Sequence, residues 1–351
     1  MPLLLSDDTV RSVLTMDACI QSLESAYKQE GLGMAANRTK STIYVRSSSG
    51  TAQYVSMEGG IRDLAAVAIR IRSHAGSPVG HAVGSVGAGV LMLFSAETGE
   101  LLALFEQRLV SCYRVGATAA LAAKHMAAKN AKVVGILGSG GMAHSHAIAY
   151  ARVRKVERFK VHSPNPQSRS AFARWITEMT NVPADAMENA EAVVRGSDIV
   201  AACTDAKDPI VKGDWLNRKG LHMTAVQSGD RSELEREGLK RFDRLVTYMS
   251  GTSTHHNTEP GHRPFINATN EASLAPFSVI PRQHSLVDVL LGKAPGRESD
   301  DECNYFFSEG TGVQFAALTA TAYRAAREQG VGEEMPEAWA RWFRSNTGRR
   351  F

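Results

Sequence analysis

A glycine-rich turn in the middle of the chain limits most strongly what this sequence can fold into. In the segment VVGILGSGGMAHSHAIAYA, from Val133 to Ala151, an apolar run ends in glycines and a helical pattern follows. Gly138, Gly140 and Ala143 form the pattern G-x-G-x-x-A. The first glycine permits a tight turn, the second lets a pyrophosphate approach the backbone, and the small third residue lets the helix pack on the strand. The turn therefore predicts a dinucleotide site at a helix N-terminus.

Strand and helix patterns alternate after this turn. Such alternation is typical of a parallel, doubly wound sheet. We therefore predict a Rossmann dinucleotide-binding domain over residues 129–304. The strands expected in it lie at 132–137, 158–163, 198–204, 221–226 and 243–249.

The residues before the turn predict a different architecture. A helix over 16–30 is followed by five short strand-like segments and a long helix over 109–127. The amphipathic pattern over 311–330 resembles this part, so we predict that it packs back on the N-terminal region. The expected fold class is α/β, with a Rossmann-type doubly wound parallel sheet inserted into an α+β domain of residues 1–128 plus 305–351.

The second strand of the predicted sheet informs the choice of cofactor. NAD-binding chains place a carboxylate at the end of this strand to bond the ribose 2'-hydroxyl. Here His162, Ser163 and Asn165 stand there, with Arg169 nearby and no carboxylate. Because such side chains can bind a 2'-phosphate, NADP(H) is favoured over NAD(H). The alternative is that Arg169 lies on the helix surface and NAD(H) binds without an acidic partner. The residues expected to contact the cofactor are Gly138, Ser139, Gly140, Gly141, Met142, Ala143, Ser163, Asn165, Arg169, Thr204 and Val226.

Composition and charge argue against several classes of protein. The 351 residues are 43% apolar and 22% charged, and the net charge of +4 includes no basic block, so we expect no nucleic-acid partner. No apolar run is long enough to span a membrane, and MPLLLSDD turns acidic too early for a signal peptide. Cys19, Cys112, Cys203 and Cys303 form no CxxC pair, which favours reduced thiols and a cytoplasmic protein.

Several motifs occur in an order that resembles a known family. They are RLVSCYRVGATAALAA, GILGSGGMA, CTDAKDPIVKGDWLNRKGLHMTAV, SELE and HSLVDVLLGKAPGR…NYFFSEGTG. Over nearly its whole length the sequence resembles the ornithine cyclodeaminase/mu-crystallin family. The resemblance implies a homodimer with an N-terminal substrate-binding and dimerisation domain. It also implies hydride transfer between a nicotinamide cofactor and the α-carbon of an amino or imino acid.

The resemblance further implies which residues bind the substrate carboxylate. Arg38 matches the arginine before the second strand. Arg114 matches the arginine of the long helix, although Val115 stands where the family usually has threonine. The family's strand lysine corresponds to Arg70, and an arginine binds a carboxylate well but exchanges protons poorly. With Arg72 close behind, these arginines would suit a substrate with two carboxylates.

A second departure concerns the proton-transfer group. Cyclodeaminases of the family place an aspartate after the strand that matches 221–226, and Asp230 reaches that position only through a gap. Asp230 and Arg70 are the candidate catalytic residues, with water as the alternative proton donor. Both departures count against ornithine cyclisation and favour a reductase.

The expected function is NAD(P)H-dependent reduction of an α-imino (ketimine) acid, or a keto acid plus amine, to an amino acid. An acidic substrate such as iminosuccinate is a candidate. Two alternatives stay open: a cyclodeaminase-type ammonia lyase with bound NAD, and a non-catalytic NADPH-binding protein like mu-crystallin. We expect no metal, because His255, His256, Glu259 and His262 match no known ligand set; their segment is expected to form a solvated loop or a lid.

Overall fold

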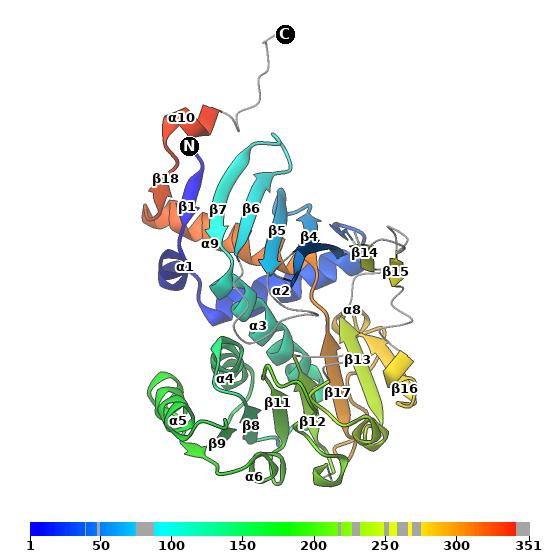
Figure 1. Cartoon of the computed structure of the whole chain (residues 1–351). Helices are drawn as coiled ribbons and strands as arrows, with labels where there is room; N and C mark the ends of the chain where they lie inside the picture. Colours follow the sequence, from blue (N-terminus) through cyan, green and yellow to red (C-terminus); the bar gives the residue numbers. More distant parts are fainter. Residues whose placement is uncertain are drawn as a thin grey trace. The chain divides into compact units, whose positions relative to one another are not determined.

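Two compact units make up the chain, and a computed structural model shows the elements of each (Figure 1). The structure describes residues 1–38, 40–47, 50–74, 88–216, 219–226, 232–248, 253–257, 266–268 and 275–341. The first unit comprises Met1–Arg114, Ser250–Asn270 and Gly310–Phe351, and the second comprises Val115–Met249 and Glu271–Glu309. The domain limits expected from the sequence, 1–128 plus 305–351 and 129–304, remain a prediction.

The first unit is built on a large, mainly antiparallel sheet. The five strands predicted between residues 40 and 106 are confirmed as β3 to β7. The spatial order is β15 (Ile266–Ala268), β14 (Ser253–Asn257), β3 (Ser41–Ser47), β4 (Gly50–Ile61), β5 (Ala66–His74), β6 (Gly89–Ser95), β7 (Leu101–Glu106), β1 (Leu3–Leu5) and β18 (Glu333–Glu334), and β2 (Ala35–Asn37) also pairs with β4.

Strand β14 corrects the expectation for the histidine-rich segment. His255 and His256, predicted in a loop, lie in a strand whose backbone pairs in parallel with β3. An edge strand such as β3 leaves a row of backbone groups to be paired, and a segment about 210 residues later pairs with it. Glu259 and His262 lie outside the described residues.

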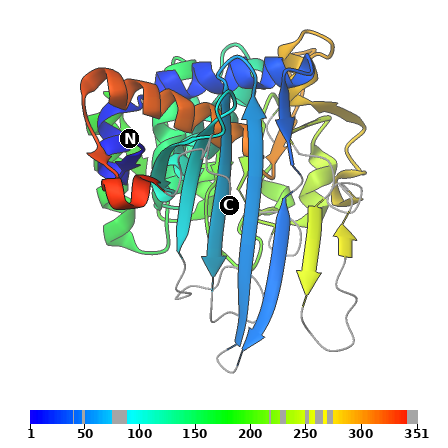
Figure 2. The ribbon, with the colours of Figure 1, turned by 90° about the horizontal axis from the view of Figure 1, so that it is seen from above.

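Helices cover one face of this sheet (Figure 2). The helix α9 packs against α2, β4 and β5, which confirms that the helix predicted over 311–330 returns to the N-terminal region. Ala68 and Arg70 of β5 are buried on this side, because alternate residues of a strand face the same way. The helices of the unit are α1 (Asp7–Val13), α2 (Met16–Gly31), α9 (Gly312–Gln329) and α10 (Glu337–Ala340).

The second unit contains a parallel sheet, which confirms the predicted α/β fold. Its central strands β11 and β12 are buried at every residue, as expected for strands covered on both faces. In spatial order the strands are β10 (Ala184–Ala186), β9 (Arg158–His162), β8 (Val133–Leu137), β11 (Ile199–Ala202), β12 (His222–Ala225), β17 (Asn304–Ser308), β13 (Arg244–Tyr248) and β16 (Arg282–Ser285).

The strand β17 reaches this sheet from near the end of the chain and lies between β12 and β13. The predicted domain limits, by contrast, place residues from 305 onward in the other domain. The helices are α3 (Arg108–Met126), which begins in the first unit, α4 (Gly141–Val153), α5 (Pro166–Thr180), α6 (Ala190–Val194) and α8 (Leu286–Leu290), with 3-10 helices at Gly213–Trp215, Arg236–Arg241 and Ala275–Phe277.

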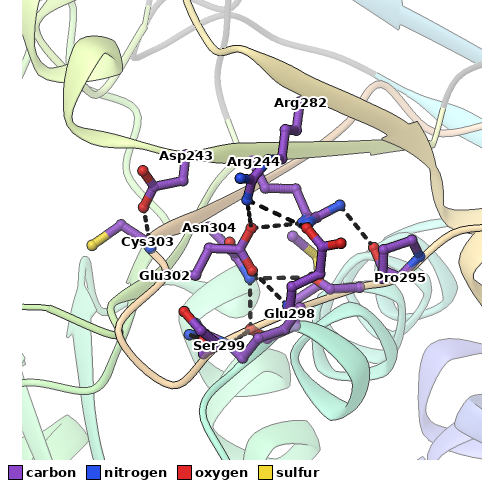
Figure 3. A network of polar contacts seen from close by, with 12 residues as sticks. Asp243, Arg244, Arg282, Pro295, Glu298, Ser299, Glu302, Cys303 and Asn304 are labelled. Atoms are coloured by element: carbon purple, nitrogen blue, oxygen red, sulfur yellow. Dashed lines mark hydrogen bonds and ion pairs between the residues drawn. The ribbon is translucent and has the colours of Figure 1, made fainter.

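An ion cluster lies at the start of β13 (Figure 3). The Arg244 side chain is fully buried, and its Nε donates to Oε1 of Glu302 at 2.9 Å while its Nη2 pairs with Glu298. Glu302 also accepts from Arg282 Nη1 at 3.1 Å and from the Glu298 amide at 2.8 Å. Every charge in this cluster therefore has an opposite charge as its partner.

Two buried histidines of the second unit should make its stability depend on pH. Burial lowers the pKa of His146 to about 4, and burial with the nearby Arg297 and Arg154 lowers the pKa of His222 to about 3. In the unfolded chain both pKa values lie near 6.5. Below that pH the unfolded chain binds more protons than the folded one. As pH decreases below about 6.5, the free energy of unfolding should therefore decrease, by up to about 1.4 kcal/mol per pH unit for each histidine.

Urea unfolding at pH 7.5, 6.5 and 5.5 measures this slope. A His222→Leu variant should have a smaller slope, because the contribution of His222 is removed. If its slope equalled that of the wild type, His222 would not be neutral in the folded state.

Candidate functional site

The glycine-rich turn joins β8 to α4. Gly138 has a φ of +102°, and a Cβ there would lie 2.3 Å from the carbonyl oxygen of Cys203, so only glycine fits. Gly140 is the N-cap residue of α4 and has no side chain that could cap this helix end. A Cβ on Gly140 would meet no atom of the described residues within 4 Å. The turn therefore fits a pyrophosphate, which the first amides of α4, from Gly141 and Met142, could bind.

The end of β9 is tied to this turn. Ser139 Oγ donates to Ser163 Oγ at 3.0 Å. The Arg169 guanidinium reaches back from α5, and its Nη1 donates to the Ser163 carbonyl at 3.1 Å. Asn165 is the N-cap residue of α5 and accepts the Ser168 amide at 2.8 Å. The structure therefore brings Ser139, Ser163 and Arg169 together, and it uses Asn165 to begin a helix.

A buried glutamate holds the ends of the next two strands. Glu233 Oε1 accepts the Thr204 amide at 2.6 Å and the Thr204 hydroxyl at 2.7 Å, and its Oε2 accepts the Val226 amide at 3.0 Å. Thr204 follows β11 and Val226 follows β12, so one carboxylate fixes both predicted cofactor contacts. Sequence reasoning missed Glu233 as a site residue, although the motif SELE contains it.

In the first unit, a buried arginine has only neutral partners among the described residues. Arg70 is 5% exposed; its Nε donates to Oε1 of Gln107 at 3.1 Å and its Nη1 contacts Sδ of Met57 at 3.4 Å. Burial, and then the positive charges of Arg114 and Arg72, lower the pKa of Arg70 to about 9. The side chain is therefore still charged at pH 7. A buried charge is stable only with an opposite charge, and a ligand carboxylate would supply one.

Arg114 lies at the same aromatic ring as Arg70. The guanidinium carbons of both lie 5.3 Å from the ring centre of Phe315. Nη1 of Arg114 donates to Oε1 of Gln314 at 3.0 Å. Desolvation, helped by the charge of Arg72, lowers the pKa of Arg114 to about 10. Arg70 and Arg114, two of the three arginines expected to bind a carboxylate, therefore lie together, and the charge of Arg72 acts on both.

The remaining predicted residues are placed differently or not described. Arg38 has a side chain that is 72% exposed and forms an ion pair with Glu58 at 3.0 Å. An exposed arginine that already has a counter-ion contributes less to anion binding than a buried one. Asp230 lies outside the described residues, so its predicted role stays a prediction.

Among the residues that the structure describes, no cluster of three or more histidine, cysteine, aspartate or glutamate side chains could hold a metal ion. Among the same residues, no helix is both long and apolar enough to span a membrane.

Known proteins resemble this chain along most of its length. Residues 2–330 match the ornithine cyclodeaminase/mu-crystallin family. A Delta(1)-pyrroline-2-carboxylate reductase of Bacillus cereus is 31% identical over 249 residues, which are 70% of this chain and 74% of that protein. An alanine dehydrogenase of Archaeoglobus fulgidus is 27% identical over 335 residues, 95% of this chain and 98% of that one.

A solved structure shares the whole fold. The Thermococcus litoralis Delta(1)-pyrroline-2-carboxylate reductase, in complex with NADH and L-proline, has a TM-score of 0.79 and 25% identity. The match covers 95% of this chain and 100% of that one. The match to the family over residues 2–330 and the two sequence relatives agree with this likeness. This chain belongs to the ornithine cyclodeaminase/mu-crystallin family.

Proposed function

We propose that this protein reduces an α-imino (ketimine) acid to an amino acid with NAD(P)H. By its relatives, the chain is an NAD(P)-dependent oxidoreductase that acts on CH–NH2 or C=N bonds. The observation that carries the proposal for the substrate is Arg70, a buried cation with neutral protein partners beside a second arginine. Such a site binds a carboxylate, which every imino acid substrate of this class has.

The residues of each unit have separate tasks in this proposal. In the second unit, the amides at the start of α4 bind the pyrophosphate, and Glu233 fixes Thr204 and Val226 at the strand ends. The nicotinamide cofactor, when bound, supplies the hydride. In the first unit, Arg70 and Arg114 bind the substrate carboxylate and so orient the carbon that accepts the hydride. Fixing a reactant in this way lowers the barrier by several kcal/mol.

In this proposal, neither Arg70 nor Arg114 donates the proton to the imine nitrogen. With a pKa of about 9, Arg70 stays protonated at pH 7 and acts as a fixed cation, not as an acid. Asp230 or water is the proposed donor.

A dicarboxylate is the proposed substrate type. The positive charges of Arg72 and Arg114 lower the pKa of Arg70, which shows that the three cations repel one another. A ligand with two carboxylates, such as iminosuccinate, would neutralise more of this charge than one with a single carboxylate.

The test follows NADPH and NADH absorbance against imino acids formed from glyoxylate, pyruvate and oxaloacetate with ammonia, with ornithine deamination assayed in parallel. We expect cofactor oxidation, with the highest kcat/KM for the imino acid formed from oxaloacetate and ammonia. Ammonia release from ornithine without net change in cofactor would mean a cyclodeaminase instead. Tight NADPH binding without turnover of any substrate would mean a non-catalytic binding protein.

NADPH should be preferred to NADH, because Arg169 is held at the end of β9 beside Ser163. An Arg169→Ala variant should raise the KM for NADPH by about tenfold or more and change the KM for NADH little. Arg174→Ala, on the exposed side of the same helix, is the matched control. If Arg169→Ala raised the KM for both cofactors equally, Arg169 would not bind the 2'-phosphate.

We also propose that two copies of the chain associate through the first sheet. Ile43, Val45, Tyr54 and Ile71 are exposed and share the face opposite to α9, as the register of β3, β4 and β5 shows. Apolar side chains grouped in this way are typical of an interface. Ile71→Asp should convert a dimer to monomers in size-exclusion chromatography with light scattering. Met179→Asp, at an exposed methionine of α5, should not, and a dimeric Ile71→Asp would exclude this face.

A further inference from the structure

Gly310 lies in the short turn between β17 and α9, with a backbone conformation that L-amino acids rarely adopt. Its φ is +79°. A Cβ on this residue would lie 2.0 Å from Nη1 of Arg114 and 2.8 Å from Cζ of the same guanidinium. Real Cβ atoms essentially never approach another atom so closely. The guanidinium of Arg114 therefore occupies the space that the side chain of any other residue at position 310 would fill.

Two other left-handed glycines of the first unit provide the contrast. Gly33 and Gly330 have φ values of +75° and +66°, and a Cβ on either would meet none of the described atoms within 4 Å. At these two positions the backbone conformation alone explains the glycine. Gly310 meets a second requirement, because it also leaves room for a charged side chain.

The chain just after Gly310 is fixed to the sheet of the first unit. Asn37 Oδ1 accepts the Val313 amide at 2.7 Å. A Cβ on Gly312 would lie 1.9 Å from the carbonyl oxygen of Glu58, so α9 begins directly against the backbone of β4. Moving this turn would break backbone packing and a hydrogen bond at a helix N-terminus. The backbone at position 310 therefore cannot easily make room for a side chain.

The guanidinium of Arg114 is the group that would move instead. It lies at the end of a long side chain, which can change rotamer at little cost. Its present position is at the Phe315 ring, where its carbon lies 5.3 Å from the ring centre, as does that of Arg70. A side chain at position 310 should therefore move Arg114 away from the ring that it shares with Arg70.

We propose that Gly310 is a positioning residue, which by having no side chain lets the Arg114 guanidinium lie against the turn before α9 and so places it beside Arg70 in the carboxylate site. This inference rests on the proposed function, because it takes the two arginines to bind the substrate carboxylate. A substitution at position 310 should weaken binding of a carboxylate ligand. It should leave binding of the cofactor unchanged, because the proposed cofactor contacts lie in the second unit.

The test measures binding of malonate, a small dicarboxylate, by isothermal titration calorimetry to the full chain in the presence of NADPH. We expect Gly310→Ala to bind malonate at least about tenfold more weakly than the wild type, with NADPH affinity unchanged. Gly33→Ala is the matched control, because it adds the same methyl group to a backbone with nearly the same φ. Both variants should lower the melting temperature by similar amounts, and Gly33→Ala should bind malonate like the wild type. Gly310→Asn, with a residue type that tolerates a left-handed backbone, should lose malonate affinity as Gly310→Ala does.

A double variant tests whether the effect acts through Arg114. Arg114→Ala removes the atoms that a Cβ at position 310 would meet. In the Arg114→Ala background, Gly310→Ala should therefore cause no further loss of malonate affinity or of kcat/KM, whereas independent effects would add. A residue with only a structural role would lower both quantities in both backgrounds, and this result would overturn the inference.

Other outcomes have separate meanings for the inference and for the proposed function. If Gly310→Ala bound malonate as tightly as the wild type, or if Gly33→Ala lost as much affinity, the inference would be wrong and the proposed function would be untouched. If the expected pattern were found but no imino acid were reduced, the inference would stand and the proposed reaction would fall. If the wild type bound no malonate, the arginines would not be a carboxylate site and the inference would fall with it.

Discussion

Replacing Arg114 with alanine should lower kcat/KM for imine reduction by more than about a hundredfold and leave the dissociation constant of NADPH nearly unchanged. Arg114 lies 5.3 Å from the Phe315 ring beside Arg70, and Gln314 fixes its direction. Without it the substrate carboxylate would lose one of two guanidinium partners and its orientation, and a small misplacement of a reactant costs about this much. The cofactor is unaffected because its proposed contacts lie in the other unit.

Steady-state kinetics with the best substrate, together with a fluorescence titration of NADPH, measures both quantities. Arg38→Ala is the comparison variant, because Arg38 is exposed and already pairs with Glu58, so its loss should matter much less. Full activity in Arg114→Ala would show that the substrate binds elsewhere. A larger loss in Arg38→Ala would mean that the exposed arginine is the main carboxylate ligand.

Replacing Glu302 with glutamine should destabilise the protein by about 3 kcal/mol. Glu302 accepts hydrogen bonds from Arg244, Arg282 and the Glu298 amide, and Arg244 is fully buried (Figure 3). Removing one carboxylate from this cluster leaves the buried guanidinium with only part of its compensation. Urea unfolding at pH 7.5, followed by circular dichroism, gives the change in free energy, and the slope against urea should not change.

A double-mutant cycle separates the pair from its surroundings. Arg244→Met should also destabilise, and the double variant should lose less than the sum of the two single losses, because neither charge is then left without the other. Additive losses would mean that the two side chains act independently.

The pKa of Glu302 also indicates how the effect of Glu302→Gln on stability should change with pH. Burial raises the pKa of Glu302, but the Glu298 amide, Arg244 and Arg282 lower it by more, so that the pKa is lowered overall. A carboxyl whose pKa is lower in the folded state stabilises the protein above its unfolded value, which is 4.5, and this stabilisation is lost as pH falls through the folded value. Glu302→Gln should therefore cost less at pH 4 than at pH 7.5.

Local patterns were sufficient to predict most helices and strands. Thr15, directly before the helix predicted over 16–30, accepts the Ala18 amide at 3.2 Å at the start of α2. A threonine directly before a helical pattern is a common helix N-cap, so this signal can be read from neighbouring residues. Gly138 is a comparable case, because its left-handed backbone excludes other residues.

The site was predicted in part. Arg70 and Arg114 lie together, as the expected carboxylate site requires, whereas Arg38 is exposed beside Glu58. What buries an arginine is the element that packs over it, and here that element is α9, about 240 residues after Arg70. No pattern around Arg38 or Arg70 could have separated them by burial.

The sequence by itself determined the glycine turn, the alternation of strands and helices, the family resemblance and the arginines on β5 and α3. These follow from the periods of strand and helix and from the sterics of glycine, which act within a few residues. Only the tertiary structure decided that β17 lies between β12 and β13, that β14 pairs with β3, and that Gln314 holds Arg114 from 200 positions away. Such contacts join segments that are distant in the chain. They depend on how complete elements pack, so a local sequence pattern cannot predict them.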